Sequence, residues 1–217
     1  MSERSTQETP RDDREISHPV FAAIYDRVPQ SWLLRSHREY LTRALSGRVL
    51  EIGAGDGAMF PYAAAAGTDI EYHAIEPDPH MRTRAESAAR ERGFPVDLRS
   101  ARAESLPYPD ESVDVVLASL VFCTIEDPDA ALAEAARVLK PGGEFRFLEH
   151  VRADGWRGSG QDLLNPLWKR AAGGCQLNRE TIPRFVSHDA FSVVEIERLR
   201  FGIFPVRPFV RGTLRRR

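Results

Sequence analysis

The chain has 217 residues, 42% of them hydrophobic, which is enough to build the core of one globular domain. Lysine and arginine (30) nearly balance aspartate and glutamate (32), so the composition does not favour nucleic acid as the main partner. Two cysteines are too few for a disulfide scaffold and indicate a reducing compartment. No segment has the pattern of a signal peptide or a transmembrane helix, so we expect a cytoplasmic protein without a membrane anchor.

The N-terminal part divides into a polar arm and two covering helices. Residues 1–16 are mostly polar or charged, and we expect them to be disordered. Apolar residues at helical spacing predict two helices within residues 17–47, the second beginning at Ser31 and ending before Gly47. These helices precede the first strand and are placed to cover a ligand. Tyr25 is a candidate to contact that ligand, although a tyrosine on such a face is also typical of a core.

The most informative stretch is an apolar strand that ends in alternating glycines, Val49-Leu50-Glu51-Ile52-Gly53-Ala54-Gly55-Asp56-Gly57. With the short helix expected over 58–67, it is typical of a nucleotide-binding α/β unit, because glycines let a ligand approach the backbone. The loop also fits the dinucleotide fingerprint, so a nicotinamide dehydrogenase remains an alternative. Two acids beside the glycines favour a cationic ligand over a pyrophosphate.

A second strand, predicted over 69–76, ends in Glu76 and is followed by Pro77 and Asp78. An acid at the tip of this strand is placed to accept hydrogen bonds from both hydroxyls of a ribose. Asp78 is the expected N-cap of a helix over 79–92 that ends at Gly93. Met81, in the first turn of this helix, is a candidate to pack either on an adenine ring or in the core.

Strands and helices continue to alternate as far as residue 150. We predict strands over 95–101, 112–119 and 144–150, with a helix over 129–139 and a turn over 140–143. This order predicts a parallel sheet with helices on both faces. Ligands of such sheets bind at the carboxyl ends of the strands, where the glycine loop, Glu76, Glu104, Ser119 and His150 are all expected.

Five motifs in this order resemble the class I S-adenosylmethionine-dependent methyltransferases of the type 11 group. They are the glycine stretch, the acid that ends the second strand, Ala103-Glu104-Ser105-Leu106-Pro107-Tyr108, Asp114-Val115-Val116, and Arg137-Val138-Leu139-Lys140-Pro141-Gly142-Gly143. The resemblance implies a Rossmann-like α/β fold with a seven-stranded, mostly parallel sheet, and S-adenosylmethionine as cofactor, converted to S-adenosylhomocysteine. It also implies that Glu51 and the glycine loop hold the methionine moiety, Glu76 the ribose, and Ala103 and Glu104 the adenine side. Arg102 departs from the family, which often has an aspartate there.

We therefore expect a single methyltransferase domain over 17–217, made of covering helices (17–47), a cofactor-binding core (48–150) and an acceptor-side part (151–217). The last part is predicted to contain helices over 161–172 and 178–188 and strands over 191–201 and 203–210. The expected cofactor-binding residues are Tyr25, Glu51, Gly53, Ala54, Gly55, Gly57, Glu76, Pro77, Met81, Ala103, Glu104 and Ser119.

Three later segments, 147–151, 165–168 and 173–180, resemble the methyltransferase-like branch that methylates small alkyl thiols. This resemblance implies a small thiol as acceptor, with His150 as the candidate catalytic residue, acting as a base or orienting the acceptor. A purely structural role for this histidine stays open. O-, N- or C-methylation of another small metabolite, such as a quinone, a natural product or a lipid-like acceptor, and a non-catalytic nucleotide-binding module are the alternatives.

The remaining predictions concern the acceptor pocket and metal binding. We expect the pocket to be lined by apolar residues of the C-terminal third, namely Leu163, Leu164, Leu167, Trp168, Phe185, Phe191, Phe204 and Phe209. The histidines are scattered and no Cys-x-x-Cys occurs, so no metal site is predicted, and Cys123 and Cys175 are expected to be small buried residues. The sequence leaves open whether the protein is a monomer or a homodimer.

Overall fold

The computed structural model describes residues 31–67 and 69–217, so the arm over 1–16 and Tyr25 lie outside the described residues. One seven-stranded sheet has the order β3-β2-β1-β4-β5-β7-β6. Its strands are β1 (Gly47–Ile52), β2 (Ile70–Ile75), β3 (Asp97–Arg99), β4 (Val113–Ser119), β5 (Leu139–His150), β6 (Phe191–Leu199) and β7 (Phe209–Arg216). Only β7, among these strands, runs antiparallel to its neighbours. The predicted α/β fold is confirmed.

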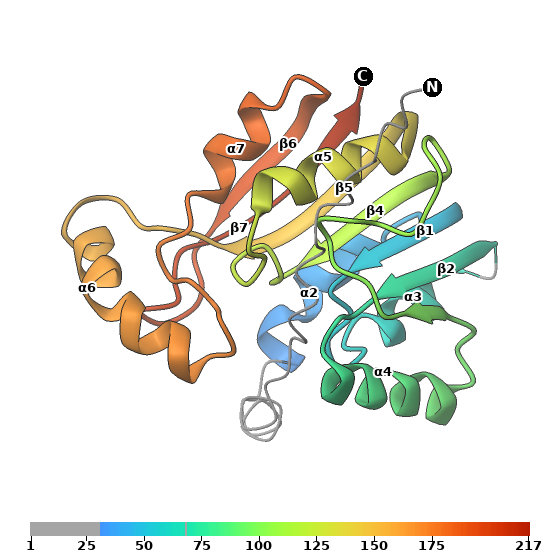
Figure 1. Ribbon diagram of the computed structural model, residues 1–217, viewed down its shortest axis with the longest axis horizontal. Coiled ribbons are helices and arrows are strands. Elements are labelled where there is room, and N and C mark those ends of the chain that lie inside the picture. Colours follow the sequence, from blue (N-terminus) through green and yellow to red (C-terminus); the bar gives the residue numbers. More distant parts are fainter. Residues whose placement is uncertain (1–30, 68) are drawn as a thin grey trace, which may run out of the picture.

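Helices cover both faces of this sheet (Figure 1). They are α2 (Ser31–Thr42), α3 (Phe60–Ala66), α4 (Pro79–Arg92), α5 (Pro128–Val138), α6 (Gly155–Ala171) and α7 (Thr181–Ser187). Successive residues of β1 point to opposite faces, so Val49 packs with the apolar residues of α2, α3 and α4, whereas Leu50 packs with those of α5 and α7. The central strands β1 and β4 are largely apolar because both of their faces are buried.

Local signals set the bounds of α4 as predicted. The Asp78 carboxylate accepts the N–H groups of His80 and Met81, and Pro79 occupies the first turn, where no backbone donor is lost. Gly93 ends the helix with φ +60°, a left-handed conformation that glycine adopts at little cost. The first turn of α4 is therefore fixed in place directly after β2.

The C-terminal third differs from the prediction. The strand predicted over 203–210 is wrong, because β7 spans Phe209–Arg216 and Pro205 and Pro208 have no N–H to donate to a ladder. The helix predicted to begin at residue 161 instead begins at Gly155, and the helix predicted from 178 begins at Thr181. The predicted turn over 140–143 is part of β5, as a bulge at which the pairing with β4 shifts register.

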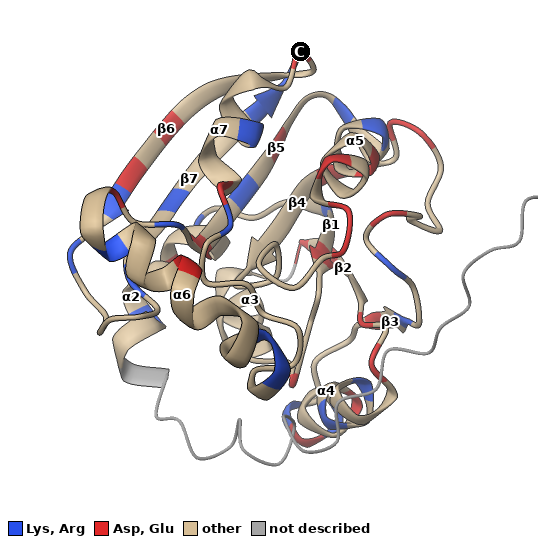
Figure 2. Cartoon of the chain, turned by 60° about the vertical axis from the view of Figure 1, so that its left-hand side comes forward, with Lys and Arg blue, Asp and Glu red and all other residues tan. Residues whose placement is uncertain are grey.

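The surface carries charges of both signs. In the view of Figure 2, α4 carries both basic and acidic residues, whereas β7 carries basic residues and no acidic ones. None of the helices in the described part of the chain is long and apolar enough to cross a membrane.

The ring of Phe185 joins α7 to the sheet. Its centroid lies 4.9, 5.2 and 4.8 Å from those of Phe122, Phe145 and Phe147, and the side chain is 1% exposed. We expect Phe185→Ala to lower the free energy of unfolding by about 3–5 kcal/mol, because it leaves a cavity between α7 and the sheet. Denaturant unfolding followed by circular dichroism measures this change.

The matched control is Val186→Ala, at a neighbouring position that is 48% exposed. It should change the free energy of unfolding by less than about 0.5 kcal/mol. Equal effects of the two substitutions would contradict the placement of Phe185 in the core.

Candidate active site

A cleft of about 640 Å³ lies at the carboxyl ends of the parallel strands. Its walls come from α2, the glycine loop, the residues that follow β2, β3 and β4, and the segment that ends α6. This is the place where parallel α/β sheets bind ligands. The predicted residues that line it are Glu51, Gly53, Ala54, Gly55, Glu76, Pro77, Met81, Ala103, Glu104 and Ser119.

Two predicted residues do not line this cleft. A Cβ on Gly57 would lie 2.7 Å from ring atoms of Phe60, so this glycine lets α3 pack closely beneath the loop. His150 is buried and contacts Cys175 instead. The apolar lining expected from the C-terminal third is also absent among the described residues of the cleft: Leu163 and Leu167 are 82% and 72% exposed, and Lys169 is the α6 residue that reaches it.

The glycine loop is tied to the neighbouring strand. The N–H groups of Gly53 and Ala54 both donate to the carbonyl oxygen of Ile75 at 3.0 Å. Gly53 has φ +70°, and a Cβ there would lie 2.3 Å from Val121. A larger residue at this position therefore clashes with the loop after β4, while the glycine leaves the backbone open to a ligand.

Glu51 and Arg38 place a buried acid and a buried cation in the wall of the cleft. Glu51 is 2% exposed and accepts a hydrogen bond from the Tyr72 hydroxyl at 2.9 Å. Burial raises the pKa of Glu51 to about 8, although Tyr72 and Arg38 oppose the rise. Arg38 is 5% exposed, and its Nε has no hydrogen-bond partner among the described residues. A buried acid and an arginine with a free Nε in the same cleft suit a zwitterionic amino-acid group, such as the one in S-adenosylmethionine.

Sequence reasoning missed Arg38, although a signal was present. It shares the buried face of α2 with Leu34 and Leu41, at helical spacing. An arginine on the apolar face of a helix is unusual and indicates either an ion pair or a ligand.

Glu76 is held by two backbone donors at the end of β2. Its Oε2 accepts the N–H of Gly55 and its Oε1 accepts the N–H of Asp78, both at 2.9 Å. Burial raises the pKa of this carboxyl, and the two N–H groups oppose the rise. Each carboxylate oxygen has further acceptor capacity, and the residue lines the cleft. These features fit a ligand with two neighbouring hydroxyls, as in a ribose.

The loop after β3 closes the opposite side of the cleft. Ala103 is buried, and Glu104 Oε1 accepts the N–H groups of Glu126 and Asp127 at 3.2 and 3.3 Å. Arg102 pairs with Glu126 at 2.8 Å. Glu104 is therefore engaged in joining the loops after β3 and β4, and Arg102, the departure from the family pattern, contributes to the same junction.

The fold also brings together Cys123, His150 and Cys175, which the sequence spacing did not indicate. His150 Nε2 lies 3.1 Å from Cys175 Sγ. The interaction between the two thiols raises the pKa of Cys123 and, together with the hydrogen bond to His150, lowers that of Cys175. Gly174 and Gln176, on either side of Cys175, line the cleft, so this cluster adjoins one of its ends.

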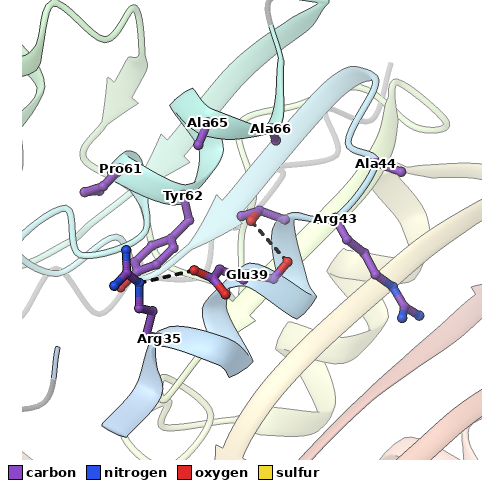
Figure 3. A pocket seen from close by; sticks show the side chains of 9 residues that line it. Arg35, Glu39, Arg43, Ala44, Pro61, Tyr62, Ala65 and Ala66 are labelled. Carbon is purple, nitrogen blue, oxygen red and sulfur yellow. Dashed lines mark hydrogen bonds and ion pairs between the residues drawn. The ribbon is translucent and has the colours of Figure 1, made fainter. Parts of the chain in front are cut away.

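A second hollow of about 870 Å³ lies between α2 and α3 (Figure 3). Its charged residues include Arg35 and Glu39, which pair with each other at 3.2 Å. It shares no lining residue with the cleft and contains none of the predicted site residues. The larger hollow is therefore not the candidate active site.

Comparison with known proteins identifies a matching family, similar sequences and similar folds. Residues 50–147 match the family described as "Methyltransferase domain". The human thiol S-methyltransferase TMT1B is 32% identical over 77% of this chain and 70% of its own length, and human TMT1A is 31% identical over 76% and 68%. Geranyl diphosphate C-methyltransferase from Streptomyces coelicolor A3(2), solved with S-adenosyl-L-homocysteine, has a TM-score of 0.66, with 13% identity over 84% of this chain and 76% of that chain.

We expect Glu76→Ala to weaken the binding of S-adenosylhomocysteine by about 2–4 kcal/mol, because charge-assisted bonds to two hydroxyls are lost. Isothermal titration calorimetry measures the affinity, and thermal unfolding checks that the glycine loop still folds. Glu86→Ala, an exposed glutamate on α4, is the control and should bind as tightly as the wild type. A loss below about 0.5 kcal/mol for Glu76→Ala would contradict its role.

The raised pKa of Glu51 predicts that the affinity depends on pH. With a pKa of about 8, this carboxyl holds its proton at pH 6–7, whereas a bound ammonium group favours the carboxylate. Binding should therefore release a proton, and the affinity for S-adenosylhomocysteine should rise from pH 6 towards pH 8 by up to about tenfold per pH unit.

Calorimetry in buffers of different ionisation enthalpy counts the released protons. Glu51→Gln, which cannot titrate, should lose this proton release and flatten the pH dependence. The difference between the two proteins separates Glu51 from groups such as Glu149, whose pKa burial raises to about 7. The same pH slope in both proteins would show that Glu51 does not contact the amino group.

Proposed function

The chain belongs to the class I S-adenosylmethionine-dependent methyltransferases, and from this premise we propose that it methylates a small thiol at sulfur. The use of S-adenosylmethionine is supported by one observation above all: the buried Glu51, the buried Arg38 and Glu76 all line the same cleft. The proposal that the acceptor is a thiol is supported by the curated human relatives, which are thiol S-methyltransferases.

When bound, S-adenosylmethionine supplies a methyl group that is already activated by a sulfonium charge. The protein then has to hold the acceptor in line and exclude water, and orientation of this kind can contribute roughly 7–11 kcal/mol to lowering a barrier. Glu51 and Arg38 are placed to bind the amino-acid end, and Glu76 the ribose. The Ala103 backbone and the Met81 side chain are the groups placed to bind the base.

The acceptor end of the cleft is lined by small and polar residues. Gly173, Gly174 and Gln176 come from the segment that resembles the thiol-methylating branch, and Thr124 faces the cleft from the loop after β4. Small and polar walls suit a small acceptor better than a large apolar one. A thiol has a pKa near 8.5 and is deprotonated in part at neutral pH, so it requires less help than a phenol or an alcohol.

A direct competition between acceptor classes tests this proposal. The protein is incubated with S-adenosylmethionine and an equimolar mixture of an alkyl thiol, a phenol, a primary amine and a carboxylate, and the methylated products are separated by mass spectrometry. We expect the methyl thioether to be the main product. Methylation of the phenol or the amine alone would reject the thiol and leave another small-molecule methyltransferase.

His150 does not line the cleft, so we propose that it positions the turn at Cys175 rather than contacting the acceptor. We expect His150→Ala to lower kcat for thiol methylation by at least about tenfold, while the dissociation constant for S-adenosylhomocysteine changes less than twofold, because the cofactor residues lie elsewhere. Steady-state kinetics and calorimetry measure the two values. His188→Ala, a histidine outside the cluster, is the control, and parallel losses of kcat and cofactor affinity in His150→Ala would indicate general misfolding instead.

A further inference from the structure

Two cysteines and a histidine from three separate parts of the chain meet beside the cleft. Cys123 follows β4, His150 ends β5, and Cys175 lies in the turn after α6. Besides the 3.1 Å contact between His150 and Cys175, the ligand atoms of all three residues lie within 4.8 Å of one another. We propose that these residues bind one Zn²⁺ ion through two thiolates and an imidazole, and leave its fourth coordination position open to a thiolate from solution.

The ligand types and their spacing fit zinc. Ligands about 2.0–2.3 Å from a tetrahedral Zn²⁺ lie about 3.5–3.8 Å apart, so the observed separations require shifts of only about 1 Å. Sulfur and imidazole ligands select Zn²⁺ over Mg²⁺ or Ca²⁺, which prefer oxygen. Structural zinc sites use four protein ligands, whereas sites with three keep a position for a substrate, and two cysteines with one histidine are a known set of the second kind.

The ligands are held in place by contacts that do not involve an ion. Glu149 Oε1 accepts two backbone N–H groups of the loop after β4, at 3.0 and 3.1 Å, and fixes the segment that leads to Cys123. The N–H of Gln176 donates to the carbonyl oxygen of Cys123 at 2.9 Å and ties the turn at Cys175 to that segment. His150 is fixed by the pairing of β5 with β7. Ligands ordered in advance reduce the entropic cost of binding.

The site is shielded from water but adjoins the cleft. Cys123 and His150 are each 3% exposed, whereas Cys175 is partly exposed, and both cysteines are free thiols. The residues on either side of Cys175 line the cleft, so the cluster lies directly behind its wall. In the part of the chain that the structure describes, no other group of histidine, cysteine and acidic side chains has this arrangement.

The fourth coordination position of the Zn²⁺ ion would bind the thiolate of the methyl acceptor. This consequence rests on the proposed function. When Zn²⁺ binds, Cys123 releases a thiol proton to water, the hydrogen-bonded pair of Cys175 and His150 releases the one proton that the two share, and an acceptor thiol that enters as fourth ligand releases its own. A lone pair of the acceptor sulfur then forms the new S–CH₃ bond. The electron pair of the broken sulfonium S–CH₃ bond stays on the cofactor sulfur, so no oxidant or reductant is needed.

Cobalt spectroscopy on the full chain tests the metal site without relying on activity. The protein is stripped with a chelator, kept reduced with a phosphine that contains no thiol, and titrated with Co²⁺. We expect one equivalent to produce the visible bands of tetrahedral Co²⁺ and a sulfur-to-cobalt charge-transfer band, and Zn²⁺ to displace it. Absence of these bands up to millimolar Co²⁺ would overturn the proposal.

Variants assign the ligands. Cys123→Ser and Cys175→Ser should each lower Co²⁺ affinity by more than about tenfold and weaken the charge-transfer band, and His150→Ala should lower the affinity while keeping that band. His80→Ala, an exposed histidine on α4, should bind Co²⁺ like the wild type. Circular dichroism of the metal-free proteins confirms that each variant folds. Unchanged Co²⁺ affinity in a folded double variant without both cysteines would also overturn the proposal.

A thiol titration separates the metal site from the proposed function. Addition of 2-mercaptoethanol to the Co²⁺-loaded protein should strengthen the charge-transfer band as a third sulfur binds. An unchanged spectrum would overturn the open thiolate position. If the metal and the thiol bind but S-adenosylmethionine yields no methyl thioether, the proposed function fails while the zinc site stands.

Discussion

The geometry of the cleft depends on one buried carboxylate. Glu76, at the end of β2, accepts the N–H of Gly55 with one oxygen and the N–H of Asp78 with the other. A single side chain therefore sets the position of the glycine loop and of the first turn of α4. The two charge-assisted bonds offset the cost of burying the carboxylate, and both are made to backbone groups of the chain itself.

The parts of this site that could be predicted from the sequence are those encoded locally. The strand, the glycines and the acid at the tip of β2 follow one another along the chain, and Asp78, Pro79 and Gly93 mark both ends of α4 by capping rules that involve only neighbours. Parallel strands bring their carboxyl ends to one edge of the sheet, so the alternation of elements was enough to place Glu51, Glu76 and Ser119 together.

The parts that could not be predicted depend on contacts between distant segments. Arg38 reaches the cleft only because α2 packs against the sheet beside Glu51, and Cys123 meets Cys175 only through the turn after α6. Strand β7 was misplaced because the apolar residues before it resemble a strand, whereas the paired segment is the more basic run Phe209–Arg216. Its register with β5 and β6 is a long-range property that local patterns do not contain.

The cleft has two chemically different ends. One end holds a buried acid and a buried cation, and the other adjoins two thiols and an imidazole. We propose that a methyl group passes from a cofactor at the first end to a thiol at the second. The most direct measurement supplies S-adenosylmethionine with a trideuterated methyl group together with an alkyl thiol and analyses the product by mass spectrometry. We expect a methyl thioether that retains all three deuterium atoms. Absence of this thioether, with S-adenosylmethionine bound and unconsumed, would contradict it.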